Sequence, residues 1–551
     1  MKGVGVRVRE AVKAFGWRRA LITAALVASA AVMLAVSMQN AFVDEYDNLL
    51  GAKVIVEGGF IYTDYFTQHM PLTYFLTSPF VLVFGTRLLW IRVAFTLVLV
   101  VWTMLIARRI SRGAGAWYAV AFATFVAVTY SMAWSNTLMA ETWTAWCVAH
   151  VVVLFWLRKR ESTPFLRSIL VMLVLASVPV LSAAAYLPVS VALYGMVAWW
   201  MIERRVDLTP WRWVAAAGVA VAPYAVVFGV LALNGAVGEA YFQAIRFNTD
   251  YYAQFNPGSP SGPVDGVLTV LQIFFNGMWN ALTDFGLANQ PIPLLLTLAT
   301  LASLAWLWLR QRWVLAGWLS ILVVFAGSRG VWGDPQEGFG ALLADNATAR
   351  HAASLLMVII LLGVIVAEDM HRSLPSPTSF AAKLRRPVQI AVATAAAAAV
   401  IVGLGVTFTQ MRNALRFDNT LAIQSHDRSA SGVVNLINNG TDGTYWMAPA
   451  EYDHQLFVTS PPASRFGYFF DHVAACAECF DEVVSDLKSQ RPRVMWFHPD
   501  SPYGPNALAR LEAEIGDDYF TLDDPALEGF LFLKADRADI VDRLRDAGFD
   551  V

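Results

Sequence analysis

Three carboxylates follow the first long apolar run of the chain, and the first two are its most prominent candidates for chemistry. Asp44, Glu45 and Asp47 lie in the stretch MQNAFVDEYDNLL (38–50), directly after an apolar run that begins at Leu21. A positioned carboxylate can accept the proton of a hydroxyl group as that hydroxyl attacks another atom. Acids also end membrane spans and mark the interface without any chemical role. The stretch therefore offers a candidate general base, and the alternative is that its acids only mark the end of a membrane span.

Three further side chains with acid–base chemistry follow. Glu141 stands alone between two apolar runs in WSNTLMAETWTAW (134–146). An ionisable group near hydrocarbon is costly and commonly functional, although the helix dipole also favours a carboxylate in the first turn of a helix. Asp64 and His69 share the stretch YTDYFTQHM. Asp64 could only cap a turn, whereas His69 could contact a phosphate or a sugar.

Arg350 and His351 are the candidates for binding a phosphate group. They lie in LLADNATARHAASLL (342–356), at the start of an apolar run. A guanidinium binds phosphate oxygens through paired hydrogen bonds, but long basic side chains also reach lipid headgroups without a specific partner. Arg329, in GSRGVWGDPQEGF, is a weaker alternative.

The composition of the chain indicates the class of protein to which these candidate residues belong. The chain has 551 residues, 57% of them hydrophobic and 15% charged, and a mean hydropathy of +0.51. Soluble domains carry about 25% charged residues, so we predict an integral membrane protein. Residues 410–551 hold 23 acids against 12 bases, and residues 1–409 hold 19 against 28. The acidic end gives no reason to expect nucleic-acid binding.

Apolar runs of about 20 residues predict the membrane spans. We expect eleven spans, the first at 20–38 and the others at 88–108, 115–133, 141–157, 165–182, 184–202, 212–233, 291–309, 313–328, 351–368 and 388–408. The shorter run 71–85 contains two prolines and is expected to lie at the outer surface. The basic clusters then all fall on one side, which the positive-inside trend identifies as the cytoplasm. The N-terminus is predicted inside, and the outer loops are 39–87, 234–290 and 329–350.

The chain is expected to have two domains, a membrane domain at 1–409 and a soluble α/β domain at 410–551 on the outer face. Aromatic and branched residues predict strands at 444–448, 493–498 and 529–535. Amphipathic patterns predict helices at 479–490 and 538–548. Cys476 and Cys479 either form a small disulfide or remain two thiols, since a single CxxC has too few ligands for a zinc site.

The first outer loop resembles that of the GT-C glycosyltransferases, the membrane enzymes of the protein O-mannosyltransferase and aminoarabinose-transferase type. The resemblance rests on DEYDNLL after the first span and on EGGFIYTDYFTQHMPLTYFLTSPFVLVFGTRLLWIRVAF (57–95). It covers about residues 20–160 and extends by topology alone to about 410. It implies that Asp44 is the catalytic base, with Glu45 as its neighbour. It also implies that Glu141 is the acid of the second outer loop, and that Arg350 and His351 open a late span.

These observations predict a glycosyltransferase with a GT-C-like helical membrane fold and a C-terminal soluble α/β domain. It would move a sugar from a polyprenyl-phosphate donor to a glycan, lipid or protein hydroxyl at the outer face of the cell membrane. The catalytic residues are predicted to be Asp44, Glu45 and Glu141, and the substrate-binding ones Arg350, His351, His69 and Asp64. A divalent metal ion is possible.

Two other functions remain open. A transporter or flippase of lipid-linked sugars should place charges near the middle of its spans, and these spans are nearly free of charge. A membrane-anchored binding or assembly protein would tolerate the loss of Asp44 and Glu141.

Overall fold

The computed structural model describes residues 2–37, 43–130, 135–160, 165–205, 209–252, 291–327, 353–372, 429–449, 452–498 and 505–551. The chain divides into two compact units. The first unit comprises Met1–Asn40, Arg92–Ala225 and Pro260–Ala414, and the second comprises Ala41–Ile91, Val226–Ser259 and Leu415–Val551. The second unit therefore joins three segments that lie far apart in the sequence.

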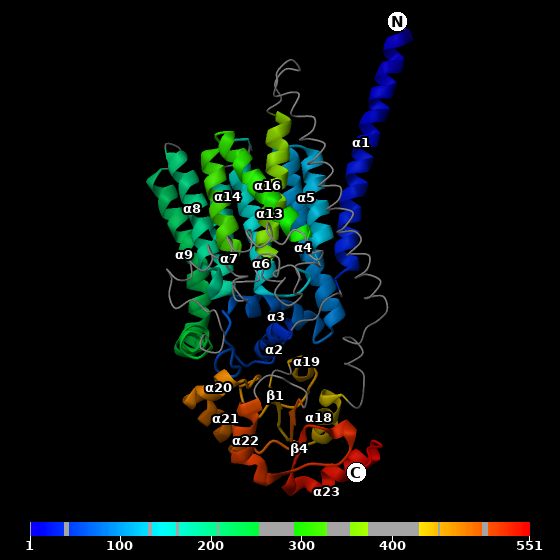
Figure 1. The fold of residues 1–551 in the computed structure, drawn as a ribbon, viewed down its shortest axis with the longest axis vertical. Coiled ribbons are helices and arrows are strands. Elements are labelled where there is room, and N and C mark those ends of the chain that lie inside the picture. The colour runs from blue at the N-terminus through cyan, green and yellow to red at the C-terminus, as the bar shows by residue number, and fades with distance from the viewer. Residues whose placement is uncertain are drawn as a thin grey trace. The chain divides into compact units, whose positions relative to one another are not determined.

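The first unit is a bundle of helices (Figure 1). They are α1 (Lys2–Ala35), α4 (Leu88–Gly113), α5 (Ala116–Thr129), α6 (Ala140–Leu157), α7 (Phe165–Ser182), η1 (Ala184–Tyr186), α8 (Leu187–Glu203), α9 (Pro210–Leu233), α13 (Pro291–Leu309), α14 (Trp313–Gly327) and α16 (Ala353–Arg372). The helices α4 and α9 extend into residues grouped with the second unit.

Burial separates a central helix of this bundle from a peripheral one. The most apolar stretch of α6 is 89% buried, and α6 packs against α7 and α16. The corresponding stretch of α9 is only 17% buried, although α9 is longer and more apolar than α6. A helix that is apolar all round is buried in protein or in lipid, so α6 forms the core and we expect α9 to face lipid.

Six helices of the described residues are long and apolar enough to cross a membrane. They are α4, α6, α7, η1 with α8, α9 and α16. Shorter apolar helices lie at Arg19–Ala35, Leu72–Phe84, Ala116–Thr129, Ala299–Leu309 and Trp313–Gly327. The chain is thus a polytopic helical membrane protein. The number of eleven spans stays a prediction, because the expected span 388–408 lies outside the described residues.

Basic residues at the ends of several helices pair with acids, and two of these acids, Glu368 and Asp369, are buried. Arg160 Nη1 lies 2.6 Å from Glu368 Oε1, and Arg312 Nη2 lies 3.0 Å from Asp369 Oδ1. Arg158 pairs with Glu203, with 2.8 Å between Nε and Oε2. The clusters predicted to share the cytoplasmic side therefore come together at one end of the bundle.

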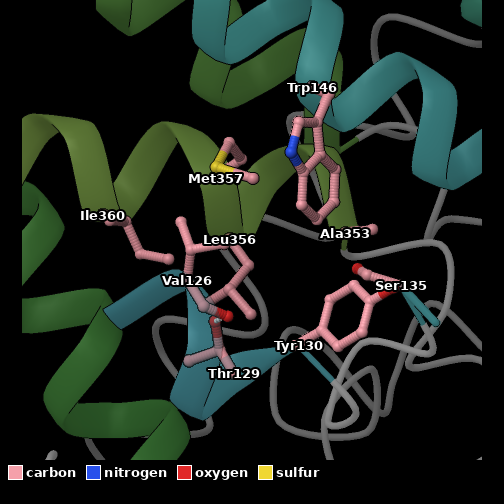
Figure 2. A pocket seen from close by; sticks show the side chains of 9 residues that line it. All are labelled: Val126, Thr129, Tyr130, Ser135, Trp146, Ala353, Leu356, Met357 and Ile360. Carbon is pink, nitrogen blue, oxygen red and sulfur yellow. Dashed lines mark hydrogen bonds between the residues drawn. The ribbon is translucent and has the colours of Figure 1, made fainter. Parts of the chain in front are cut away.

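A small hollow lies among α5, α6 and α16 in the first unit (Figure 2). Its wall is mostly apolar, with Val126, Leu356, Met357 and Ile360 among the lining residues. The Trp146 indole also faces it and donates a hydrogen bond of 3.0 Å to Thr103 Oγ1. Among the residues named by the sequence as candidates for chemistry, none lines this hollow.

The helices of the second unit are mostly short. They are α2 (Val43–Val56), α3 (Leu72–Phe84), α10 (Val237–Tyr241), the π-helical turn η3 (Phe242–Arg246), α11 (Phe247–Asp250), α18 (Ala430–Asn438), α19 (Tyr452–Gln455), α20 (Asp471–Ala475), α21 (Ala477–Gln490), α22 (Pro505–Ile515), η8 (Gly516–Asp518), η9 (Pro525–Leu527), η10 (Lys534–Asp536) and α23 (Arg537–Asp546).

Four strands of the second unit form one mixed sheet in the order β1-β2-β4-β3. These strands are β1 (Tyr445–Ala448), β2 (Val494–Phe497), β3 (Tyr519–Phe520) and β4 (Phe530–Leu533). The pair β1–β2 is parallel, and β4 is antiparallel to both β2 and β3. Strands β1, β2 and β4 lie where the sequence predicts strands, and α21 and α23 lie where it predicts helices.

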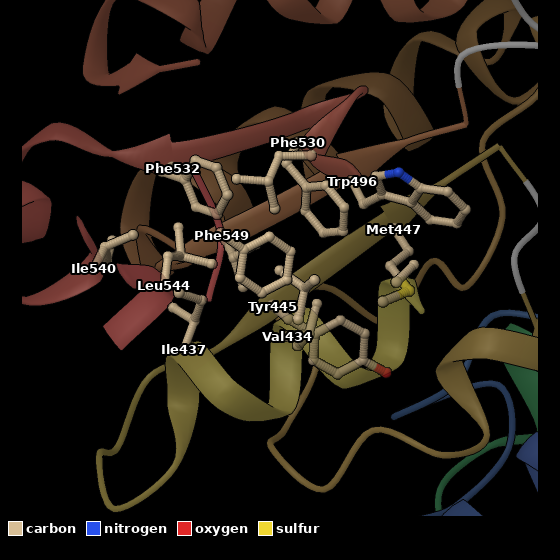
Figure 3. Close-up of a cluster of buried hydrophobic side chains, with 14 of the residues drawn as sticks. Val434, Ile437, Tyr445, Met447, Trp496, Phe530, Phe532, Ile540, Leu544 and Phe549 are labelled. Carbon is tan, nitrogen blue, oxygen red and sulfur yellow. The ribbon is translucent and has the colours of Figure 1, made fainter. Parts of the chain in front are cut away.

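Alternate residues of the strands build the core on one face of this sheet (Figure 3). Tyr445 and Met447 of β1 point to this face because side chains alternate along a strand. The helices α18 and α23 cover it with the apolar residues Val433, Val434, Ile437, Ile540 and Leu544. On the other face, the Trp446 ring lies 5.5 Å from that of Phe469. Both faces are therefore covered.

Candidate active site

The helix α2 presents two acids to a hollow in the second unit. Asp44 lies in the first turn of α2, where the helix dipole favours a carboxylate. Asp47 follows one turn later, and residues three apart share a helix face. Both line the hollow, which measures about 360 Å³ including the part open to solvent. Glu45 is fully buried and is not among the residues that line it.

Two tyrosines hold the Asp47 carboxylate inside the protein. Tyr65 donates its hydroxyl to Asp47 Oδ1, and Tyr74 donates to Oδ2, each at 2.5 Å. Asp47 is only 2% exposed. Burial raises the pKa of its carboxyl above the ordinary value of 3.8, although the nearby His69 and the two hydroxyls act to lower it. The folded structure therefore makes Asp47 bind its proton more tightly than an exposed aspartate does.

The close packing of α2 on α3 depends on a glycine. A Cβ atom at Gly51 would lie 2.5 Å from Cδ1 of the Tyr74 ring and 3.3 Å from Cδ1 of the Tyr65 ring. A methyl group at this position would push the Tyr74 ring from its place beside Asp47. The absent side chain of Gly51 thus lets both tyrosines reach the carboxylate.

His69 lies beside Asp47 at the end of the connection between α2 and α3. Its Nε2 atom is 3.8 Å from Asp47 Oδ2, and its side chain is 30% exposed. The Tyr62 hydroxyl donates to the His69 carbonyl oxygen at 2.8 Å, and the His69 N–H donates to Thr67 Oγ1 at 3.1 Å. These bonds fix the backbone of His69, and the residue lines the hollow.

Asp64 stabilises a turn in the same connection. Its Oδ2 atom accepts hydrogen bonds from the Phe60 N–H at 2.7 Å and from the Thr63 hydroxyl at 3.1 Å. A short acidic side chain that accepts from nearby backbone is typical of turns. Asp64 is exposed and does not line the hollow.

The segment 237–250 clamps this connection from one side. The Gln243 side chain accepts a hydrogen bond from the Thr67 N–H at 3.0 Å and donates to the Tyr62 carbonyl oxygen at 2.7 Å. Gln243 lies in the π-helical turn η3, an irregularity that is frequent at functional sites. Asn248 donates to the Gln68 carbonyl oxygen at 2.7 Å. The backbone on either side of His69 is therefore tied down.

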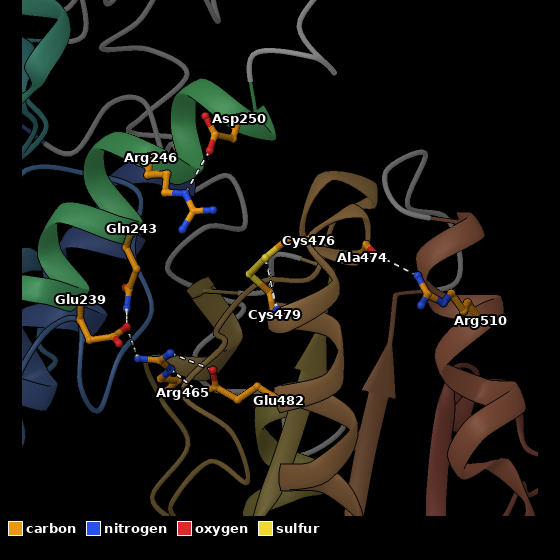
Figure 4. Close-up of a disulfide and its surroundings, with 10 residues drawn as sticks. All are labelled: Glu239, Gln243, Arg246, Asp250, Arg465, Ala474, Cys476, Cys479, Glu482 and Arg510. Carbon is orange, nitrogen blue, oxygen red and sulfur yellow. Dashed lines mark hydrogen bonds and ion pairs between the residues drawn. A yellow bond between two sulfur atoms is a disulfide. The ribbon is translucent and has the colours of Figure 1, made fainter.

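The C-terminal segment holds the same connection through Arg465. Its Nη1 atom donates to the Tyr62 carbonyl oxygen at 2.6 Å and lies 3.1 Å from Glu239 Oε2 (Figure 4). Its Nη2 atom donates to Glu482 Oε2 at 2.8 Å. The helix that carries Glu482 begins beside the disulfide between Cys476 and Cys479. Of the two states that the sequence leaves open for these cysteines, the structure has the disulfide.

Three aromatic residues of the C-terminal segment complete the wall of the hollow. Tyr452 of α19, Tyr468 and Phe470 line the hollow together with Asp44, Asp47, Gln68 and His69. Lys53 of α2 donates to the Val458 carbonyl oxygen at 2.7 Å, and the Phe66 ring stacks on Phe466 at 4.4 Å. The site is thus made by residues from both ends of the chain.

The predicted site residues have different fates. The structure brings Asp44 and His69 to one hollow. Glu45 is buried and does not line this hollow, and Asp64 stabilises a turn. Glu141 is buried in the first turn of α6, in the first unit. Arg350, His351 and Arg329 lie outside the described residues, so their roles stay predictions. Among the residues that the structure describes, no three His, Cys, Asp or Glu side chains are grouped to hold a metal ion.

Sequence analysis did not select Asp47, Gln68, Tyr452, Tyr468 or Phe470 as site residues. The spacing of three between Asp44 and Asp47 could have indicated that both acids face one way. No comparable signal exists for the aromatic residues, because they reach the hollow only through the folding of a segment about 400 residues away.

Comparison with known proteins finds similar solved structures but no similar sequence. No family model and no curated protein sequence matches the chain. Its structure is similar to that of ArnT from Cupriavidus metallidurans in the apo state, with a TM-score of 0.51 and 12% identity over 94% of this chain and 98% of that one.

Two further solved structures are less similar. ArnT from the same organism bound to undecaprenyl phosphate has a TM-score of 0.49 at 13% identity, over 94% of this chain and 98% of that chain. The oligosaccharyltransferase of Archaeoglobus fulgidus in complex with Zn and sulfate has a TM-score of 0.45 at 13% identity, over 90% and 71%. The similarity to apo ArnT shows a shared fold and confirms the GT-C fold predicted from the first outer loop.

Proposed function

We propose that the protein is a membrane glycosyltransferase that transfers a sugar from a polyprenyl-phosphate donor to a hydroxyl group of an acceptor at the outer face of the cell membrane. The observation that carries this proposal is the position of Asp44, at a hollow that also holds Asp47, His69 and aromatic side chains. The shared fold with ArnT supports the same class of protein.

Asp44 acts as the general base in this proposal. Its carboxylate takes the proton of the acceptor hydroxyl as the hydroxyl oxygen bonds to the anomeric carbon of the donor sugar. The bond between that carbon and the phosphate oxygen breaks, and polyprenyl phosphate leaves with the electron pair. One displacement of this kind inverts the configuration at the anomeric carbon.

His69 and Asp47 support the reaction from the same hollow. An imidazole beside a buried carboxylate is positioned to donate a hydrogen bond to an oxygen of the substrate. Asp47 is held too deeply by Tyr65 and Tyr74 to exchange protons freely with solvent. Asp47 is therefore a positioning residue for His69, whereas the more accessible Asp44 receives the proton.

The test compares Asp44→Asn with the wild-type chain in purified form. Radiolabelled polyprenyl-phosphate sugars serve as donors, and a cell-envelope extract with glycan, lipid and protein fractions supplies acceptors. We expect the substitution to lower the transfer rate by about 10² to 10⁴-fold, the usual effect of losing a general base. The control is Glu57→Gln, which removes the charge of an exposed acid just beyond the end of α2.

Each other outcome has a definite meaning. Transfer that survives in a well-folded Asp44→Asn variant would refute Asp44 as the base. If the wild-type chain transfers no sugar from any donor but moves lipid-linked sugars across vesicle membranes, the transporter alternative replaces the transferase.

A further inference from the structure

The aromatic wall of the hollow is a rigid surface. The Tyr468 ring lies 6.2 Å from that of Tyr452 and 5.7 Å from that of Phe470, measured between centroids. The Gln455 side chain donates to the Gly467 carbonyl oxygen at 2.7 Å, and the Trp446 indole donates to the Phe466 carbonyl oxygen at 3.1 Å. The backbone before Tyr468 is therefore fixed from two directions, which holds the ring in place without a ligand.

Two polar atoms at this hollow lack hydrogen-bond partners in the described part of the chain. They are the Tyr468 hydroxyl and Gln68 Oε1, and both are buried. Tyr468 is only 2% exposed. Buried polar groups are nearly always hydrogen-bonded, and the hydroxyls of Tyr65 and Tyr74 beside the hollow follow this rule. Tyr468 and Gln68 together thus offer a donor and an acceptor to something that enters.

The charges of the lining residues indicate which chemical class of ligand fits the hollow. Two carboxylates and one imidazole line the hollow, and its lining set, as the structure describes it, contains no Lys or Arg. Among the described lining residues, a phosphate group would meet two negative charges and no guanidinium or ammonium group. A ring with apolar C–H faces and several hydroxyl groups fits better. Its faces pack on aromatic rings, and its hydroxyls pair with carboxylate, amide and phenol oxygens.

We infer that this hollow binds a saccharide ring, with Tyr452, Tyr468 and Phe470 as its aromatic wall and with Tyr468 and Gln68 as hydrogen-bonding partners of its hydroxyls. The inference rests on the proposed function, because it identifies which part of the substrates lies beside Asp44. It assigns the segment 452–470 to substrate recognition. The ring belongs to the donor sugar or to a sugar of the acceptor, which have the same chemistry.

Tyr468→Phe tests the inference with the smallest change. It removes only a hydroxyl that has no partner in the described chain, so the thermal midpoint should not fall. Binding should weaken by about threefold to tenfold, the equivalent of one hydrogen bond. The probes are methyl glycosides of common hexoses and pentoses in both anomeric forms, titrated onto the full chain in detergent and followed by saturation-transfer NMR.

Matched variants keep the test specific. Tyr519→Phe removes another buried hydroxyl without a partner among the described residues, on β3 and not at the hollow, and should leave glycoside binding unchanged. Gln68→Met replaces the second polar group by a side chain of similar length and should weaken binding as Tyr468→Phe does. No binding to the wild-type chain, or equal binding to all four proteins, would overturn the inference.

The KM values for donor and acceptor show whether the bound ring belongs to the donor or to the acceptor. If Tyr468→Phe raises KM for the acceptor alone, the hollow holds an acceptor sugar. If it raises KM for the donor alone, the hollow holds the donor sugar. Glycoside binding needs no turnover, so it can succeed where the proposed transfer fails. Conversely, transfer that depends on Asp44 but is indifferent to Tyr468 and Gln68 refutes only this inference.

Discussion

Asp44 and Asp47 are two carboxylates of one helix face in unlike surroundings. Asp44 is partly exposed at the hollow, whereas Asp47 is buried and accepts hydrogen bonds from Tyr65 and Tyr74. Exposure to the hollow lets Asp44 reach a substrate hydroxyl, whereas the two tyrosine hydroxyls fix the orientation of Asp47. The contrast supports a base at Asp44 and a fixed partner for His69 at Asp47.

The buried Asp47 should make stability depend on pH. Its pKa is raised in the folded protein, so the folded state binds the proton more tightly than the unfolded chain does. Stability is then greatest at low pH and falls as the pH rises from 3.8 through the folded-state pKa. We expect the thermal midpoint of the wild type, relative to Asp47→Asn, to fall over this range. A difference that is flat, or that rises with pH, would contradict the assignment.

Tyr65→Phe should expose the strength of the bond to Asp47. A hydrogen bond to a charged group contributes about 1.5–3 kcal/mol, so the free energy of unfolding should fall by that amount. In the Asp47→Asn background the same change should cost about 1 kcal/mol or less. Chemical denaturation of the four proteins measures the coupling. Equal costs in both backgrounds would show that Tyr65 acts through packing and not through the carboxylate.

Residue types predicted part of this site. Asp44 stood out because an acid after an apolar run lies at an interface where it can serve as a base, and His69 because it could contact a phosphate or a sugar. Asp47 was in the same stretch but had no distinguishing feature, since its role comes from two tyrosine hydroxyls. The proposed binding role of Tyr468 could not be predicted, because it depends on a buried hydroxyl without a hydrogen-bond partner in the described chain. Only the folded structure shows this feature.

At the scale of elements, the irregular connection 57–71 is held by groups outside itself. It contains only an isolated bridge between Ile61 and Tyr65, and Tyr62 adopts a positive φ of 74°. A non-glycine residue in this region is strained and persists when its surroundings enforce it. Gln243 and Arg465 provide that enforcement, so the shape of the site depends on the fit of three segments.

Gln243→Ala should loosen this connection. It leaves the buried Thr67 N–H without its partner and removes one of two hydrogen bonds to the Tyr62 carbonyl oxygen. We expect a loss of about 2–4 kcal/mol in the free energy of unfolding and slower sugar transfer. Asn234→Ala is the control, because Asn234 is exposed and surface changes usually stay within about 0.5 kcal/mol. Equal stability of both variants would refute the clamp.

The elements themselves followed from local patterns. Runs of apolar residues predicted α6, α7 and α8 within a few residues, and aromatic and branched clusters predicted β1, β2 and β4. Local pattern did not predict the clamp, because the π-helical turn at Phe242–Arg246 and its contact with Thr67 join residues 176 apart. Pairings over such distances leave no periodic signal in a sequence.

At the scale of the whole molecule, the orientation in the membrane is a prediction from charge. The described residues contain six helices able to cross a membrane, and the basic clusters gather at one end of the bundle. We propose that this end is cytoplasmic and that the residues after 410 lie outside. A disulfide between Cys476 and Cys479 is consistent with that side, since disulfides persist in oxidising compartments.

A cleavable epitope fused after Val551 tests this orientation. We expect protease added to intact cells to remove the C-terminal epitope and to leave the same epitope before Met1 untouched. Cell lysis should make both epitopes accessible. Protection of the C-terminal epitope together with cleavage of the N-terminal one would invert the orientation and move the site to the cytoplasm.

The contact between Tyr62 and Arg465 also sets an order of events during synthesis. The two residues are 403 positions apart, and ribosomes add about 5–20 residues per second. The loop that carries His69 must therefore wait roughly 20 to 80 s for the segment that completes it. During that interval Phe66 lacks the ring of Phe466 on which it stacks in the finished protein. The nascent chain thus has a period in which its helices can insert into the membrane while the site is still incomplete. A chaperone that binds the first outer loop would act during this period.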